Sequence, residues 1–388
     1  MSRKLFIIIL FFLCDIVCGE LMFVDSNSPD VPGSGSSADP FRFIKTAIEQ
    51  SEDGDRIILA EGVYTGQGNT NLGFGGKAIE ICSRKPSDPE VISNTIIDAN
   101  GSDRVFYFRD DEDENSIVRG LTIRNGSANY GGGIYCFNNS SPSIEQCFII
   151  SNEADYGGGV CCVASSPIFK NCVIRGNEAD FGGAFSCRHS EIRVINCTIV
   201  DNSSGIYCHN IVEGELNPIL INTLICGNDS FGIEEFGEFA DADVSFCCFF
   251  GNGDGNWYDY DEGAIFNDEQ EINSLPQAHD NVVSEPQLNS DRYHLNYGSM
   301  CIDSGNPAVG IMLDIDGKPR VIGESIDIGC HEFYLFGDLN YDGKVNFGDL
   351  DLMCFDWLGD EFYAESDLNL DYNVNFKDLS LMGQNWGK

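Results

Sequence analysis

The sequence predicts an all-β protein, a right-handed parallel β-helix with an N-terminal capping helix, followed by a small α module. The first sign is a repeat of about 25 residues through the middle of the chain. The second is a duplicated pattern in residues 338–388, where an acidic loop twice precedes an apolar helix. Short strands therefore dominate most of the chain, and helices follow at its end.

Residues 1–19 have the features of a secretory signal peptide. Arg3 and Lys4 supply the positive start, residues 5–13 form an unbroken apolar run, and Gly19 is small enough to precede a cleavage site. The apolar run is too short to span a bilayer. We therefore expect a secreted protein without a transmembrane span, whose β-helix domain covers residues 20–333.

The charge balance is strongly acidic. Lys and Arg number 22 against 62 Asp and Glu, which gives a formal net charge of −40. Binding to the phosphates of nucleic acid needs clustered cations, so this balance argues against a nucleic-acid partner. The charge suits contact with cations, or it serves solubility alone.

A capping helix is expected at about residues 40–51. Asp39 is placed to cap its N-terminus and Pro40 to occupy its first position. Phe41, Ile44 and the alanine–isoleucine pair that follows form one apolar face, which would cover the open end of the first coil. Coils are expected over about residues 55–252, and residues 253–333 are expected to be irregular.

The coils are predicted from two phases of the repeat. Short β-branched or aromatic runs precede asparagines at Asn100, Asn125, Asn152, Asn177, Asn202, Asn228 and Asn252. Glycine-rich segments such as 129–136 and 155–162 provide the tight bends between strands. Coils stacked at about 4.8 Å would align equivalent residues, so the asparagine amides would form a hydrogen-bonded ladder.

The cysteines follow the same period. Cys147, Cys172, Cys197 and Cys247 share one phase, and Cys136, Cys162, Cys187 and Cys208 share another. Thiols that fill a narrow core explain such ladders most simply. Disulfides between neighbouring coils remain an alternative, whereas the absence of CxxC pairs gives no support for zinc.

Two stretches resemble bacterial secreted β-helix proteins. "AIEQSEDGDRIILAEGVY" matches the helix, turn and strand with which those proteins open, and "SMCIDSGNPAVGIMLDIDGKPRVIGESIDIGCHEF" is similar to their C-terminal segment. The resemblance covers residues 39–333 and implies a pectin-lyase-like fold. It does not imply one activity, because that fold carries lyases, hydrolases and adhesins. Residues 253–283 break the repeat, as a lid, a loop or an irregular coil.

Residues 334–388 are predicted to bind calcium. Their two twelve-residue loops place oxygen ligands at the alternate positions of an EF-hand loop. The first loop offers Asp338, Asn340, Asp342, the Lys344 carbonyl, Asn346 and Asp349, and the second offers Asp367, Asn369, Asp371, the Asn373 carbonyl, Asn375 and Asp378. Gly343 suits the sharp turn of the first loop, whereas Tyr372 at the equivalent position should cost strain.

Paired loops of this kind resemble a type I dockerin, the module that docks enzymes onto cohesin domains. The calcium ligands match the dockerin pattern position by position. The docking positions, often Ser-Thr in cellulosomal dockerins, are Phe347-Gly348 and Phe376-Lys377 here. The resemblance implies a protein partner, either cohesin-like or of another kind.

No catalytic group can be read from the sequence. Asp155 and Asp180 should stack one coil apart with Asn129 beside them, as a possible glycan or cation surface. Two classes therefore stay open. One is a non-catalytic surface or glycan-binding protein that docks through its calcium module. The other is a carbohydrate-active enzyme, a polysaccharide lyase or glycoside hydrolase acting in polysaccharide catabolism.

Overall fold

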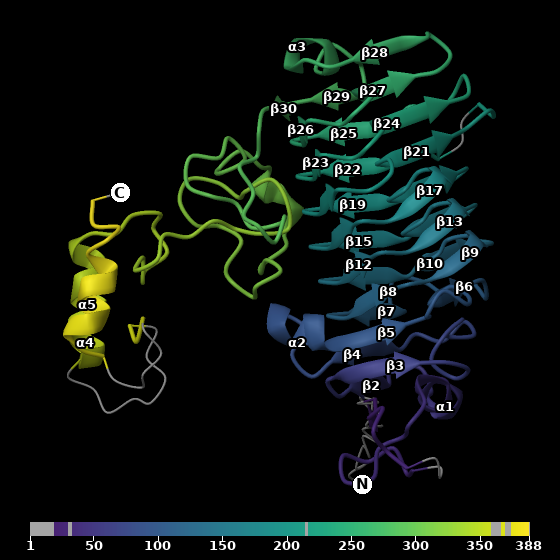
Figure 1. The fold of residues 1–388 in the computed structure, drawn as a ribbon, viewed down its shortest axis with the longest axis horizontal. Coiled ribbons are helices and arrows are strands. Elements are labelled where there is room, and N and C mark those ends of the chain that lie inside the picture. Colours follow the sequence, from purple (N-terminus) through teal and green to yellow (C-terminus); the bar gives the residue numbers. More distant parts are fainter. Residues whose placement is uncertain (1–18, 30–32, 214–215, 358–365, 369–373, 388) are drawn as a thin grey trace, which may run out of the picture.

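The computed structural model describes residues 19–29, 33–213, 216–357, 366–368 and 374–387. The chain winds into a right-handed parallel β-helix whose coils stack along one axis (Figure 1). The predicted signal peptide lies outside the described residues except for Gly19. Within the described residues, no helix has the length and apolar character needed to cross a membrane.

Three parallel sheets run along the stack, and they are named here sheets 1 to 3. In the described residues, sheet 1 has ten strands: β1 Leu21–Val24, β2 Arg56–Leu59, β4 Glu80–Ser83, β7 Ile117–Arg119, β11 Ser143–Glu145, β15 Ile168–Lys170, β19 Arg193–Ile195, β22 Ile219–Ile221, β25 Asp243–Ser245 and β29 Ala278–His279. Sheet 2 has nine: β3 Gly62–Thr65, β5 Thr95–Asp98, β8 Thr122–Arg124, β12 Phe148–Ile150, β16 Val173–Arg175, β20 Thr198–Val200, β23 Leu224–Cys226, β26 Cys248–Phe250 and β30 Val282–Val283.

Sheet 3 forms the third side, and a short sheet 4 lies beside part of it. Over the same described ranges, sheet 3 has eight strands: β6 Phe106–Phe108, β10 Ile134–Phe137, β14 Val160–Val163, β18 Phe185–Arg188, β21 Ile206–His209, β24 Phe231–Phe236, β27 Gly255–Asp259 and the antiparallel β28 Ala264–Phe266. Sheet 4 has three: β9 Ser127–Tyr130, β13 Glu153–Tyr156 and β17 Glu178–Phe181.

Helix α1 (Ile44–Gln50) lies at the N-terminal end of the stack (Figure 1). It buries Ile44, Ala47 and Ile48 in the main core. The prediction that Asp39 caps this helix was wrong, because residue 43 occupies the N-cap position without a side-chain cap. The preceding segment is instead extended: the Phe41 amide donates to the carbonyl of residue 23 at 2.9 Å. Strand pairing therefore delays the start of the helix.

The asparagine ladder forms over five coils. The side-chain amide of each of Asn152, Asn177, Asn202 and Asn228 donates to the side-chain oxygen of the next asparagine, ending at Asn252, over 2.9–3.0 Å. Asn125 lies outside the ladder, because β8 pairs with β12 in a register that puts Gly126 opposite Asn152. Asn125 donates instead to Asp98.

The cysteine ladders point into the stack. Cys136, Cys162, Cys187 and Cys208 pair in register on sheet 3 and belong to the main core. All described cysteines are free thiols, and all of these except Cys354 are buried. Burial raises the pKa of the Cys162 and Cys187 thiols well above the ordinary value, so these side chains are neutral.

Residues 253–283 continue the stack. Strands β27 and β28 form a hairpin, helix α3 (Glu269–Ile272) follows, and β29 and β30 extend sheets 1 and 2. Of the three alternatives for this segment, the structure favours an irregular coil. Its helix begins at a capping box between Asp268 and Glu271.

Residues 284–333 form a segment that we call the C-terminal brace. It contains the short 3₁₀ helix Pro307–Val309 and runs back along the outer face of sheet 2. Turn side chains hold it: Gln146 donates to the Asp314 carbonyl at 2.9 Å, and Asn171 donates to the Leu313 carbonyl at 2.8 Å. Part of the outer face of sheet 2 is therefore covered by the chain itself.

The C-terminal module lies beyond the brace (Figure 1). It contains α4 (Phe347–Trp357) and α5 (Phe376–Met382), which share a small core with Leu335 and Val345. Aromatic side chains of each repeat pack against an aromatic side chain of the other repeat. Phe347 of the first packs edge-on against Trp386 of the second at 5.2 Å, and Phe376 packs against Trp357 at 4.9 Å.

Candidate functional site

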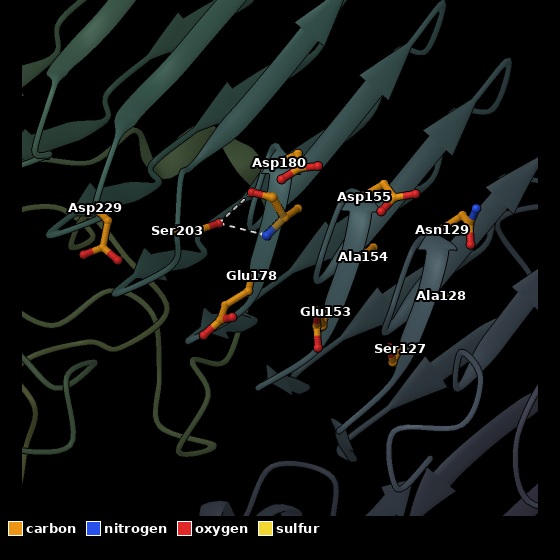
Figure 2. A pocket seen from close by; sticks show the side chains of 11 residues that line it. Ser127, Ala128, Asn129, Glu153, Ala154, Asp155, Glu178, Asp180, Ser203 and Asp229 are labelled. Carbon is orange, nitrogen blue, oxygen red and sulfur yellow. Dashed lines mark hydrogen bonds between the residues drawn. The ribbon is translucent and has the colours of Figure 1, made fainter.

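Sheet 4 brings the predicted surface residues together. In β9, β13 and β17, the alanines Ala128, Ala154 and Ala179 pair in register, so equivalent residues repeat on three successive coils. Asn129, Asp155 and Asp180 follow these alanines and lie in a row on the outside of the stack (Figure 2). All three are exposed.

These residues line a groove of about 520 Å³, which we call the acidic groove. Glu153 and Glu178 form its second edge (Figure 2). The full lining is Ser127, Ala128, Asn129, Glu153, Ala154, Asp155, Glu178, Ala179, Asp180, Ser203 and Asp229. None of these described lining residues carries a positive charge. The small alanine side chains leave space between the two edges, and the carboxylates offer hydrogen-bond acceptors along both edges.

The strands of sheet 4 end at a stacked aromatic column. Tyr130, Tyr156 and Phe181 stack with ring centroids 5.4 and 5.0 Å apart and interplanar angles of 13°. Glycines at positive φ, such as Gly157 at 66°, then turn the chain towards sheet 3. Because the rings stack on one another along the axis, their faces are covered within the column. The column therefore stiffens the groove more than it offers a free ring face to a sugar.

The charges of the groove determine what it can bind. Carboxylates on neighbouring coils are about 4.8 Å apart at the backbone, so they repel one another unless water, a cation or a hydroxyl-rich ligand intervenes. Ser203 is held in place, since its hydroxyl accepts from the Ala179 amide at 2.9 Å and donates to its carbonyl at 3.1 Å. The groove thus contains acceptors for a cation or for sugar hydroxyls, and its lining contains no Lys, Arg or His to act as a base.

In the first acidic loop of the module, the carboxylates accept hydrogen bonds from backbone amides of the same loop. The Asp338 carboxylate accepts from the Gly343 amide at 2.8 Å, and the Asp349 carboxylate accepts from the Leu339 and Asn346 amides at 2.8 Å. Gly343 has a φ of 80°, as the sharp turn requires. Burial, together with the charges of Asp349 and Asp342, raises the pKa of Asp338 to about 6.

This donor set fits calcium. One loop carries two buried carboxylates, the exposed Asp342, the amide oxygens of Asn340 and Asn346 and the Lys344 carbonyl. Hard oxygen ligands at alternate positions are those that Ca²⁺ prefers. A bound cation would also relieve the repulsion that raises the Asp338 pKa.

The second loop is described only in part. Asp367, Asn375 and Asp378 are described, whereas Asn369, Asp371, Asn373 and Tyr372 lie outside the described residues. The described portion matches the first loop, because the Asp378 carboxylate accepts from the Asn375 amide at 2.8 Å as Asp349 does from Asn346. Asp378 is fully buried, as is Asp349.

Sequence reasoning missed a cluster in the brace. His294 contacts Asp291 through Nδ1 at 2.6 Å and Asp316 through Nε2 at 2.7 Å, and His331 lies next to it. These residues are too far apart in sequence for any spacing to indicate the cluster. Burial works against charging the His294 ring, but the hydrogen bonds and charges of Asp316 and Asp291 raise its pKa to about 9.

The hydrogen bonds of the cluster indicate that the ring nitrogens facing its carboxylates carry protons and do not bind a metal ion. The Leu295 amide donates to His331 Nδ1 at 3.3 Å, which leaves the proton of a neutral His331 on Nε2, the atom that faces Asp316. Burial lowers the pKa of His331 to about 3, so this ring is neutral. The positive His294 ring then bridges two carboxylates and joins two loops of the brace.

A second groove, of about 590 Å³, which we call the arginine groove, lies between helix α2 (Pro89–Asn94), sheet 2 and residues 290–293. Arg124 and Arg175 line it, beside Phe148 and Tyr293. Arg124 pairs with Asp98 at 2.8 Å, and Arg175 donates to the Asp291 carbonyl at 2.7 Å. This groove therefore combines arginine side chains with a partly apolar lining, whereas the acidic groove is lined by carboxylates and has no cationic side chain.

Comparison with known proteins agrees with the fold. Residues 60–213 match a family model described as a right handed beta helix region. No curated protein matches the chain. Among solved structures, the crystal structure of pectate lyase Pel9A is similar at 15% identity and a TM-score of 0.47, and the alignment covers 81% of this chain and 96% of that one. The family match, together with the stacked coils described above, shows that the chain contains a right-handed β-helix.

Proposed function

We propose that this chain is a secreted, calcium-binding β-helix protein that binds polysaccharide without cleaving it and docks to a protein partner through its C-terminal module. The observation that carries the proposal is the first acidic loop, in which Asp338 and Asp349 are buried and accept hydrogen bonds from backbone amides of the same loop. Loop and helix recur in α5 with the same Asn–Asp pairing, which supports a module built around calcium.

The acidic groove supports the polysaccharide part of the proposal. It extends over three coils of sheet 4, and an elongated row of acceptors suits a polymer that lies along the axis. The edges offer carboxylates and Asn129, which can accept hydrogen bonds from sugar hydroxyls directly or through a shared cation. Because the lining has no cationic side chain, binding is favoured over proton abstraction.

The exposed aromatics of the module support the docking part. Phe347 and Phe376 stand at equivalent positions of the two repeats and are 77% and 76% exposed. Each phenylalanine packs against a tryptophan of the other repeat, and exposed apolar patches of this kind mark interaction surfaces. Because phenylalanine occupies the positions where cellulosomal dockerins often have Ser-Thr, the partner needs an apolar surface of its own.

The arginine groove favours a second candidate function, a carbohydrate-active enzyme. Arg175 has no carboxylate within ion-pair distance among the residues that the structure describes, and hydroxyl groups of Ser93 and Tyr293 lie in the same lining. A polysaccharide lyase needs a cation or base near its substrate acid. Binding in the acidic groove and catalysis in the arginine groove can therefore be tested separately.

Calcium titration of the full chain by calorimetry tests the calcium site. We expect a binding heat in the unmodified protein, and a loss of affinity of at least tenfold in Asp349→Asn, which removes a buried ligand charge. Asp155→Asn in the acidic groove serves as the control and should leave the module's binding unchanged. No heat in the unmodified chain, or equal affinity in Asp349→Asn, would contradict the calcium site.

A further inference from the structure

The C-terminal brace meets the last coils through a cluster that contains three thiols. Cys226 and Cys248 lie on the outer face of sheet 2, together with Val200 and Leu224. Leu295, Cys301 and Ile328 of the brace pack onto them. Cys248 and Cys301 are both fully buried, and they come from segments that are far apart along the chain.

Cys248 and Cys301 approach each other from opposite sides. Phe249 of the same strand points into the main core, so Cys248 points outwards, towards the brace. The two thiols belong to the same buried cluster, and the neighbouring Cys301 thiol, together with burial, raises the pKa of Cys248 well above its ordinary value. The backbone holds both residues: the Cys248 amide donates to the Thr223 carbonyl at 3.0 Å, and the Ile328 amide donates to the Cys301 carbonyl at 2.9 Å.

The ladder cysteines differ in direction. In-register neighbours on a parallel sheet, such as Cys136 and Cys162, have parallel Cα–Cβ bonds about 4.8 Å apart. A disulfide prefers Cβ atoms about 3.8 Å apart with bonds that converge. Ladder thiols are therefore poorly placed to pair, whereas Cys248 and Cys301 reach one cluster from two different segments of the chain.

We propose that Cys248 and Cys301 form a disulfide bond that fastens the C-terminal brace to strand β26. The two thiols lose two protons and two electrons, an S–S bond forms between them, and a disulfide oxidant such as glutathione disulfide is reduced to two thiols. Because a buried neutral thiol is a poor nucleophile, the bond forms during folding, before the brace covers sheet 2. The inference rests on the proposed secretion, since an oxidising compartment allows such bonds to persist.

The bond would act on the brace, a long segment that side chains hold to the stack. The brace is joined to the stack through side chains such as Gln146 and Asn171 and through small apolar clusters. A covalent link restricts the unfolded chain and so favours the docked brace. Resistance of residues 284–333 to proteolysis should therefore depend on the oxidation state.

The test refolds the full chain in a glutathione redox buffer, blocks remaining thiols after denaturation and maps peptides without reduction. We expect the Cys248 peptide to be linked to the Cys301 peptide, and the Cys136, Cys162 and Cys172 peptides to be blocked as thiols. Cys301→Ser should leave Cys248 open to blocking, whereas Cys226→Ser, a matched change in the same cluster, should keep the link.

Blocked thiols at both Cys248 and Cys301 in the unmodified chain would overturn the inference, as would a Cys226–Cys301 link or links between ladder neighbours. The mapping of the unmodified chain needs no variant to fold. Because the buffer supplies the oxidant, a negative result would not bear on secretion, and a protein that remains inside the producing cell would contradict secretion without bearing on this pairing.

Discussion

His294 shows how a single side chain can join loops that no local pattern connects. Its ring lies between the carboxylates of Asp291 and Asp316, at 2.6 and 2.7 Å, and packs against Tyr293 and His331. Because His331 is neutral, one positive ring faces two negative groups. The pair of ion-pair hydrogen bonds holds residues 291–294 against residue 316.

This arrangement predicts a stability change at alkaline pH. The folded-state pKa of His294 is raised to about 9, above an unfolded value of about 6.5, so its contribution is complete below pH 6.5 and is lost as pH rises through 9. We expect a free energy of unfolding larger by about 2 to 3 kcal/mol at pH 6 than at pH 10, from this group alone. Urea titrations of the unmodified chain and His294→Gln at both pH values measure the difference.

His279→Gln is the matched control, because His279 is an exposed histidine beside a single carboxylate. Its pH dependence should match that of the unmodified chain, whereas His294→Gln should lose most of the change between pH 6 and pH 10. On the acid side, the hydrogen bonds from His294 hold the pKa of Asp291 below its usual value against the effect of burial. That contribution is present above pH 3.8 and is lost as pH falls further. Equal pH dependence in all three proteins would contradict the bridge.

At the scale of the element, each coil depends on the asparagine of the next. Asn202 accepts from Asn177 and donates to Asn228, both at 3.0 Å, and its side-chain nitrogen also reaches the Ile174 carbonyl. All three asparagines are buried, so water cannot replace the lost partner. The ladder therefore fixes one turn of the stack through side chains.

Asn202→Ala should destabilise the protein by about 2 to 3 kcal/mol, because the buried backbone amide of Asn177 loses its acceptor and the Ile174 and Val200 carbonyls lose a donor. Chemical denaturation monitored by circular dichroism measures this loss. Asn129→Ala, at an exposed position in the acidic groove, is the control and should change stability by less than about 0.5 kcal/mol. A similar, small change in both variants would show that the ladder contributes little.

Sequence reasoning reached the elements that repeat and missed those that do not. Coil period, strand positions and the stacking of Asp155 on Asp180 follow from a pattern that every coil shows. Asn125 was placed in the ladder because its spacing of 27 residues from Asn152 is close to the repeat. The strand register instead puts Asn152 opposite Gly126, one position later. Asp39 was assigned as a cap because its sequence context suits one, but pairing of Phe41 with strand β1 extended the chain there.

At the scale of the whole molecule, the chain combines a rigid stack, a brace that covers one face and a compact module beyond it (Figure 1). The course of the brace could not be predicted, since its contacts join residues such as Asn222 and Asn306 that no period relates. The brace covers part of the outer face of sheet 2, whereas the acidic groove on sheet 4 stays open. A ligand that lies along the stack therefore meets the acidic groove on a face that the chain leaves exposed.

Binding to polysaccharide is the central claim, and one measurement tests it most directly. The full chain is run in affinity electrophoresis through gels that contain neutral or acidic polymers, with calcium present, and the same mixtures are followed for unsaturated or reducing sugar products. We predict retardation by at least one polymer, loss of that retardation in the double variant Asp155→Asn with Asp180→Asn, and no product. Cleavage of a polymer, or retardation that the double variant leaves unchanged, would contradict the account.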